Sequence, residues 1–225
     1  MPYLVTLSLL GLFGKLAWWQ WHKAEAKEQR LARLTALAEQ GPKPLAELLA
    51  EGGELQDAQA RVEGRWLPRA ILWDNRTLDR RVGYDLLQPV ETNAGIVLVN
   101  RGWLPAPARR SQLPELPLAR GQVVLSGRLV RPEASLRLAE LPPERIDGAL
   151  RVQWPLPGPI AQALDLELLP VVLAPSESTD NLRPHWAPLT MSPQKHRGYA
   201  LQWATMALAL AIAFLYWRSK QRKTP

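Results

Sequence analysis

Residues 198–217 read GYALQWATMALALAIAFLYW, a run without a charged side chain. A helix rises about 1.5 Å per residue, so this run would extend roughly 30 Å as a helix, which is the thickness of the hydrocarbon core of a bilayer. Both ends carry aromatic residues, whose rings prefer the headgroup level: Tyr199, Trp203, Tyr216 and Trp217. A buried core helix fits less well, because a basic stretch follows at once. We therefore predict a transmembrane helix over 198–217 and a basic cytoplasmic tail over 218–225.

A second apolar block occupies residues 3–21, near the other end of the chain. It contains Lys15, which lies close enough to the end of the block for its ammonium group to reach the headgroups. A cleaved signal peptide is the alternative, but the block lacks a basic start and a small-residue cleavage site. We therefore predict a second transmembrane helix over 3–21.

Two basic clusters give conflicting indications of orientation. One is the tail, and the other follows the first helix on the opposite side of the membrane: Lys23, Lys27, Arg30 and Arg33. A long intervening domain is translocated largely irrespective of its charge, so the compact tail carries more weight. This predicts that both termini are cytoplasmic.

Between the two blocks the chain changes from a helical to a β-prone pattern. Residues 24–51 predict a helical connector, since Leu31, Leu34 and Leu37 recur at helical spacing. Residues 60–190 are rich in short β-prone runs separated by turn formers, and a short helix is expected over 155–164. The runs are 61–67, 71–75, 84–90, 95–101, 122–131 and 168–173.

The run Ile-Val-Leu-Val at 96–99 is apolar on both faces of a strand, which predicts a central strand of the β domain. The fold class is therefore a membrane protein in which two transmembrane α-helices flank a mostly antiparallel β domain. That domain is expected to be a small barrel or sandwich with minor helices.

The composition excludes several classes of site. No Cys is present, which removes disulfides, thiolate metal sites and the C-x-x-C-H haem attachment. The signatures of common hydrolases, nucleotide-binding proteins and zinc proteases are missing, so the sequence does not support an enzyme. The net charge is +7, but basic residues flank the apolar blocks, which favours phospholipid headgroups over nucleic acid as a partner.

Three His residues are present, at positions 22, 185 and 196. His196 lies between Lys195 and Arg197, two residues before the apolar run. A neutral imidazole there could be an axial ligand to a haem iron, with Trp203 and the apolar helix as a surface for the macrocycle. The alternative is a His that faces the headgroups within a basic cluster, and the residues alone leave both interpretations open.

Four motifs, in order along the chain, carry a resemblance to a known family. They are LAWWQWHK at 16–23, VEGRW at 62–66 with Gly83 and Tyr84, VLVNRGWLP at 97–105, and HRGYALQW at 196–203. With these motifs the chain resembles the surfeit locus protein 1 family, the membrane assembly factors of cytochrome c oxidase. The motif residues that the resemblance singles out are Trp19, Gln20, Asn100, Arg101, Gly102, Trp103, His196 and Tyr199.

The resemblance implies a multi-pass protein of the bacterial inner membrane with a periplasmic central domain. It implies a chaperone rather than an enzyme, acting in the maturation of subunit I of cytochrome c oxidase, complex IV of the respiratory chain. Subunit I and the lipid bilayer are the expected partners, haem a synthase is a further candidate partner, and no nucleic acid is expected.

Haem a is the cofactor that the resemblance implies, held or passed on transiently near His196, with no metal beyond the haem iron. Tyr199, Trp203 and Arg101 are the other candidate haem contacts. Arg101 could pair with a propionate, because a guanidinium suits bidentate carboxylate contacts; the alternative is a structural Arg in a β-turn. The alternative function is a membrane-anchored scaffold that docks on subunit I without binding haem.

Overall fold

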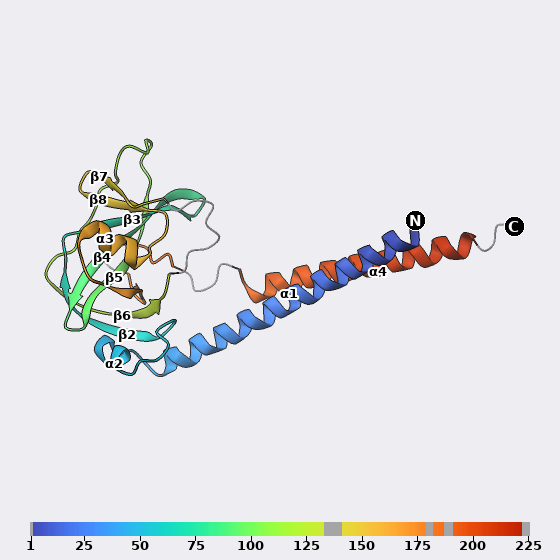
Figure 1. Cartoon of the computed structure of the whole chain (residues 1–225), viewed down its shortest axis with the longest axis horizontal. Helices are drawn as coiled ribbons and strands as arrows, with labels where there is room; N and C mark the ends of the chain where they lie inside the picture. The colour runs from blue at the N-terminus through green and yellow to red at the C-terminus, as the bar shows by residue number, and fades with distance from the viewer. Residues whose placement is uncertain (1, 133–140, 179–181, 187–190, 222–225) are drawn as a thin grey trace. The chain divides into compact units, whose positions relative to one another are not determined.

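The computed structural model describes residues 2–132, 141–178, 182–186 and 191–221. The chain forms two compact units (Figure 1): a helical unit, Met1–Ala36 with Ala187–Pro225, and a β-unit, Leu37–Trp186. The helices are α1 (Pro2–Glu39), α2 (Leu45–Ala50), α3 (Pro157–Leu164) and α4 (Pro193–Gln221). The strands are β1 (Lys43–Pro44), β2 (Gln59–Trp66), β3 (Ala70–Leu78), β4 (Arg81–Thr92), β5 (Gly95–Pro105), β6 (Gln122–Val130), β7 (Glu144–Ile146), β8 (Ala149–Val152) and β9 (Leu168–Pro175).

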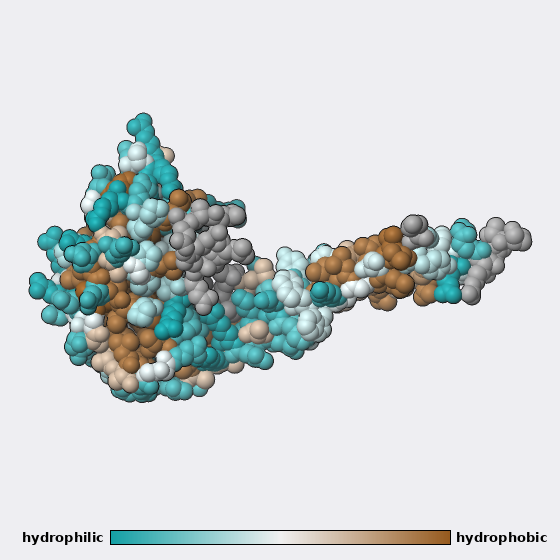
Figure 2. Space-filling view, in the orientation of Figure 1, coloured by the Kyte–Doolittle hydropathy of each residue, from teal (hydrophilic) through white to brown (hydrophobic). Residues whose placement is uncertain are grey.

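The helical unit is an antiparallel pair of α1 and α4. The ring of Tyr3 lies 5.2 Å from that of Phe214 at one end of the pair, and the ring of Phe13 lies 5.7 Å from that of Trp203 further along. Helix α1 runs without a break through the predicted span and into the predicted connector, since neither Gly nor Pro occurs between positions 15 and 40. Figure 2 shows an apolar band over the first turns of α1 and the α4 turns beside them.

The predicted C-terminal membrane helix corresponds to α4. Within the described residues, α4 is the one helix that is long and apolar enough to cross a membrane. Helix α1 does not meet the same measure, and Lys15 lies within its apolar half. The second span over 3–21 therefore stays a prediction.

The β-unit is built on a closed ring of five strands. The hydrogen-bonded order is β2-β4-β5-β9-β6, and a β2–β4 pairing at Gly64–Trp66 closes the ring. Strands β3, β8 and β7 extend the sheet from β4, and β1 extends it from β2. The pairs β1–β2, β3–β8 and β5–β9 are parallel, and the other pairs are antiparallel. Of the two predicted architectures, the barrel is correct, and its strand order is that of the Greek-key barrel called the OB-fold, which serves many functions.

Strand β5 lies in the wall of this barrel, paired on both sides with β4 and β9, as expected of an interior strand with an apolar run. Val97 and Val99 pack into the barrel interior with Val62, Val90 and Leu129. Leu98, on the opposite face, packs under α3 and β8 in a second cluster whose other buried members are Ile71, Trp73, Leu87, Leu150, Val152, Ile160 and Val172. The alternation of a β-strand thus places apolar side chains in two cores, which explains why both faces of β5 are apolar.

Candidate functional site

The motif at 97–105 forms a β-bulge in β5. Asn100 pairs with Leu87 and Gly102 pairs with Leu86, so Arg101 between them is an extra residue in the ladder. Gly102 has φ 125, which residues with a side chain rarely adopt. The Asn100 Oδ1 atom accepts a hydrogen bond of 3.0 Å from the Gly102 N–H. The Asn-Arg-Gly sequence therefore encodes the bulge locally.

The bulge directs Arg101 into the interior, where it is 1% exposed. Its guanidinium donates to Gln88 Oε1 at 2.9 Å and to the carbonyl of Pro117. Gln88 Nε2 in turn donates to the carbonyls of Leu67 and Ala119, each at 2.9 Å. Arg101 and Gln88 thus fasten the Pro-rich segment after β5 to the barrel, and this placement favours the structural interpretation of Arg101 over the propionate contact.

A second arginine, Arg151 on β8, fastens the other end of the same segment. It donates to the carbonyl of Arg110 at 2.9 Å and forms a salt bridge of 2.7 Å with Glu144. Burial lowers the pKa of Arg151, but its hydrogen bonds to Glu144 and Tyr84 raise it further, and the net shift is upward. Arg151 is therefore cationic at any physiological pH.

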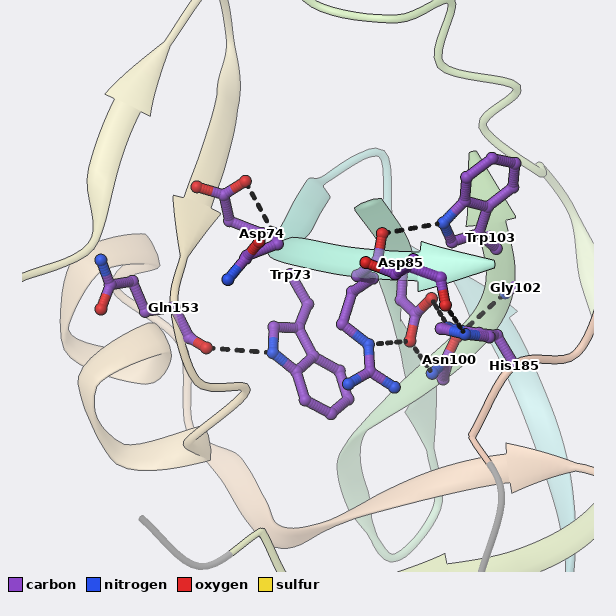
Figure 3. A network of polar contacts seen from close by, with 11 residues as sticks. Trp73, Asp74, Asp85, Asn100, Gly102, Trp103, Gln153 and His185 are labelled. Carbon is purple, nitrogen blue, oxygen red and sulfur yellow. Dashed lines mark hydrogen bonds and ion pairs between the residues drawn. The ribbon is translucent and has the colours of Figure 1, made fainter. Parts of the chain in front are cut away.

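A buried carboxylate, Asp85 on β4, lies at the centre of a polar network (Figure 3). Asp85 is fully buried and accepts from Arg76 Nε at 2.9 Å and from Asn100 Nδ2 at 3.4 Å. Its other oxygen lies 2.8 Å from His185 Nδ1, and His185 Nε2 lies 3.0 Å from the carbonyl of Thr77. This network joins β3, β4 and β5 to the segment 182–186, which precedes α4 in sequence.

The motif residue Trp103 belongs to the same region. Its indole N–H donates to the carbonyl of Arg76 at 3.2 Å, and its backbone N–H donates to the carbonyl of Arg183 at 2.9 Å. A Cβ at Gly83 would lie 2.6 Å from the Trp103 ring, so the ring packs where only a glycine leaves room. Asn100, Gly102 and Trp103 thus all have structural roles in the β-unit.

The segment 182–186 is anchored to the β-unit along its length. Leu182 is buried in a third cluster, with Leu72 and Leu86, and Arg183 pairs with Asp79 at 2.7 Å. The ring of Trp186 lies 4.9 Å from that of Trp73, and its carbonyl accepts from Arg128 at 3.2 Å. The sequence did not predict this anchor, because its partners are separated from it by up to about a hundred residues.

The helical unit brings together two other motif residues, Gln20 on α1 and His196 on α4. The Nδ1 atom of His196 lies 2.8 Å from Gln20 Oε1, and His196 is 9% exposed. An amide oxygen only accepts, so this contact fits the neutral tautomer with the proton on Nδ1 and the lone pair on Nε2. Within the part of the chain that the structure describes, Nε2 has no hydrogen-bond partner. Ala24 and Ala200 are buried close by, and their small side chains permit the close approach of the helices.

The remaining predicted residues of the helical unit occupy different surroundings. Tyr199 is 46% exposed, whereas the Trp203 ring lies against Phe13. Trp19 is 46% exposed, with the Lys23 ammonium 5.9 Å from its ring. The predicted site residues thus fall into two sets, one in each unit. Among the described residues, no group of three His, Cys, Asp or Glu side chains could hold a metal ion.

Comparison with known proteins supplies the family. A model of the SURF1 family matches residues 7–208. The chain belongs to the SURF1 family. This confirms the resemblance to the surfeit locus protein 1 family, and no curated protein matches the chain. SURF1 family members are associated with assembly of cytochrome c oxidase and are assembly factors rather than enzymes.

The SURF1 match extends over both units. It therefore includes the motif at 97–105 in β5, called here the barrel motif, and the Gln20–His196 pair. In the barrel, the motif residues are occupied by contacts within the fold. In the helix pair, His196 keeps one ring nitrogen available. Among the motif residues that the structure describes, His196 thus carries a ring nitrogen without a hydrogen-bond partner in the first turn of α4.

Proposed function

We propose that the protein is a membrane-anchored assembly factor of cytochrome c oxidase that holds haem a at His196 while subunit I matures. The observation that carries this proposal is the hydrogen bond of 2.8 Å between His196 Nδ1 and Gln20 Oε1. It leaves the Nε2 lone pair for iron, the arrangement usual for a metal-bound His. The SURF1 family's association with oxidase assembly supplies the context.

His196 and Tyr199 suit a haem that is bound transiently and then passed on. When bound, the haem supplies an iron that accepts imidazole as an axial ligand. Tyr199 follows His196 by three residues and is 46% exposed, so its ring is open to a planar ligand. We propose that His196 is the one protein ligand, which would hold the group less firmly than two ligands and therefore suits transfer to subunit I. Haem a synthase is then the enzyme expected to supply the group.

The pairing of the helices supports two membrane spans. Because Tyr3 contacts Phe214 and Phe13 contacts Trp203, the apolar half of α1 lies beside the apolar stretch of α4. Trp18, Trp19, Trp21 and Tyr199 are exposed near one end of this apolar zone, as expected of a headgroup belt. We assign the protein to the bacterial inner membrane with both termini cytoplasmic and the β-unit periplasmic. Reporter enzymes fused to the C-terminus test this orientation.

A second candidate function is a scaffold that docks on subunit I and never binds haem. The observation that favours it is the barrel motif, whose residues are explained by the fold without any ligand. The two functions differ in whether His196 is needed for a bound chromophore.

The test is the absorption spectrum of the protein purified in mild detergent from cells that make haem a. We expect a Soret band in the wild type and its loss in His196→Ala. The matched control is His22→Ala, because His22 is an exposed α1 residue whose Nδ1 is 3.0 Å from the Trp18 carbonyl. It should keep the band.

Two outcomes would contradict haem binding at His196. No band in the wild type would favour the scaffold, and a band that persists in His196→Ala would place the iron ligand elsewhere. Far-UV circular dichroism of each variant shows whether the helices are intact.

A further inference from the structure

We infer that Gln20 is the positioning residue of His196: it fixes which ring nitrogen carries the proton and where the other nitrogen points. This inference rests on the proposed function, because positioning matters for a ligand that Nε2 would bind. The two residues are 176 positions apart in sequence and meet across the helix pair at 2.8 Å.

The chemistry of the contact defines the role. A neutral imidazole has one N–H donor and one acceptor nitrogen, and either nitrogen can take either part. With Oε1 of the Gln20 amide facing the ring, as in this structure, the contact favours the form with the proton on Nδ1, because that oxygen offers only lone pairs. Without that acceptor, nothing among the described residues would hold the proton there.

The helix pair also restricts the orientation of the imidazole. His196 is 9% exposed, and Gln20 is partly buried. Beside it, Arg197 pairs with Glu28 at 2.8 Å and lies over the Trp21 ring at 5.6 Å. Contacts on two successive residues therefore limit rotation of α4 about its own axis against α1.

A hydrogen-bond acceptor behind a ligating His raises the basicity of the other nitrogen and orients the ring. Its removal typically costs about 10–100-fold in metal affinity. A Gln that only joined two membrane helices would have neither effect. The tautomer of His196 and the redox potential of bound iron therefore separate positioning from simple helix packing.

The first experiment needs no haem. The full chain is labelled with ¹⁵N in detergent, and the ring nitrogens of His196 are identified by comparison with His196→Ala. We expect the proton on Nδ1 in the wild type and in Gln20→Glu, which keeps an acceptor oxygen. In Gln20→Leu we expect the proton to redistribute to Nε2.

The second experiment is haem titration of the same proteins. We expect Gln20→Leu to bind haem about 10–100-fold more weakly. Gln20→Glu should retain the affinity, with a lower midpoint potential because a carboxylate donates more charge through the ring. Glu28→Gln is the matched control, since it removes the charge from the neighbouring contact between the helices and leaves Gln20 in place. We expect it to change haem affinity less than about fivefold and the tautomer not at all.

The outcomes separate this inference from the proposed function. A proton on Nε2 in the wild type would overturn the inference, and so would Gln20→Leu behaving as wild type in both experiments. Equal losses in Glu28→Gln and Gln20→Leu would reduce Gln20 to a packing contact, which also overturns it. If the tautomer follows Gln20 as expected but the wild type binds no haem, the proposed function fails and the positioning by Gln20 stands.

Discussion

The motif at 97–105 in the barrel and the Gln20–His196 pair in the helical unit use their polar groups differently. In the β-unit, Asn100 holds the bulge and contacts Asp85, and the Trp103 indole N–H has a carbonyl partner. In the helical unit, His196 uses Nδ1 for Gln20 and keeps Nε2 available. A motif residue can therefore serve the shape of the fold, as Asn100 does, or keep a polar atom without a partner among the described residues, as His196 does. Only the partners of each atom distinguish the two.

The two regions also differ in how much stability rests on charge. Asp85 is fully buried among three donors, whereas a salt bridge of the helical unit, Arg197–Glu28, is 49% and 38% exposed at its two side chains. Breaking a buried pair strands a charge in a low-dielectric interior, while an exposed pair is replaced by water. Substitutions in the β-unit should therefore affect folding, and those around His196 should affect ligand binding.

The largest effect on stability is expected from Asp85→Ala. It leaves the partly buried Arg76 and His185 without their acceptor, and the loss of these charge-assisted contacts should lower the free energy of unfolding by roughly 3–5 kcal/mol. Urea unfolding of the full chain in detergent, followed by near-UV circular dichroism, measures this. The matched control is Glu63→Ala, whose exposed pair with Arg61 contributes about 1 kcal/mol or less. Equal effects of the two variants would contradict the role given to Asp85.

The next effect is expected from Arg101→Met. Hydrogen bonds to a charged group contribute about 1.5–3 kcal/mol each, and Arg101 makes such bonds to Gln88 and Pro117. We expect a loss of roughly 3 kcal/mol in unfolding free energy with unchanged haem content per folded molecule. The control is Arg120→Met, an exposed residue of the same segment. If Arg101→Met instead lost haem at unchanged stability, the result would support the alternative that Arg101 pairs with a haem propionate.

A smaller effect is expected from Gly102→Ala. The backbone there has φ 125, and an added Cβ would lie 2.6 Å from the Arg183 carbonyl oxygen. Strain of this kind amounts to about 1–3 kcal/mol, and the contact with Arg183 must open to relieve it. Gly158→Ala is the control, because nothing lies within 4 Å of a Cβ at that position. A neutral Gly102→Ala would show that the bulge tolerates a side chain.

Much of the fold could be predicted from local pattern. The uncharged run at 198–217 predicted α4. Apolar residues on both faces of 96–99 predicted that β5 is an interior strand. The absence of a helix breaker between positions 15 and 40 was a signal that α1 continues past its apolar block. Such features depend on residues near one another in sequence, which is why the sequence reveals them.

The polar contacts could not be predicted, because their partners are distant in sequence. Asp85 stands between Tyr84 and Leu86, and by strand alternation it would pass for a surface residue. Its partners Arg76, Asn100 and His185 are 9, 15 and 100 positions away. Gln20 and His196 are 176 positions apart. Their roles depend on strand register and helix pairing, which a single sequence does not specify.

The smallest effect is expected from Arg183→Ala. Its salt bridge with Asp79 is 71% exposed on both sides, and such pairs contribute about 1 kcal/mol or less. Its backbone carbonyl, which accepts from the Trp103 N–H, is retained in the variant. We therefore expect unfolding free energies of Arg183→Ala and the control Arg81→Ala to agree within about 0.5 kcal/mol. A loss of more than about 2 kcal/mol in Arg183→Ala alone would mean that the side chain, rather than the main chain with Leu182 and Trp186, holds the segment before α4 on the barrel.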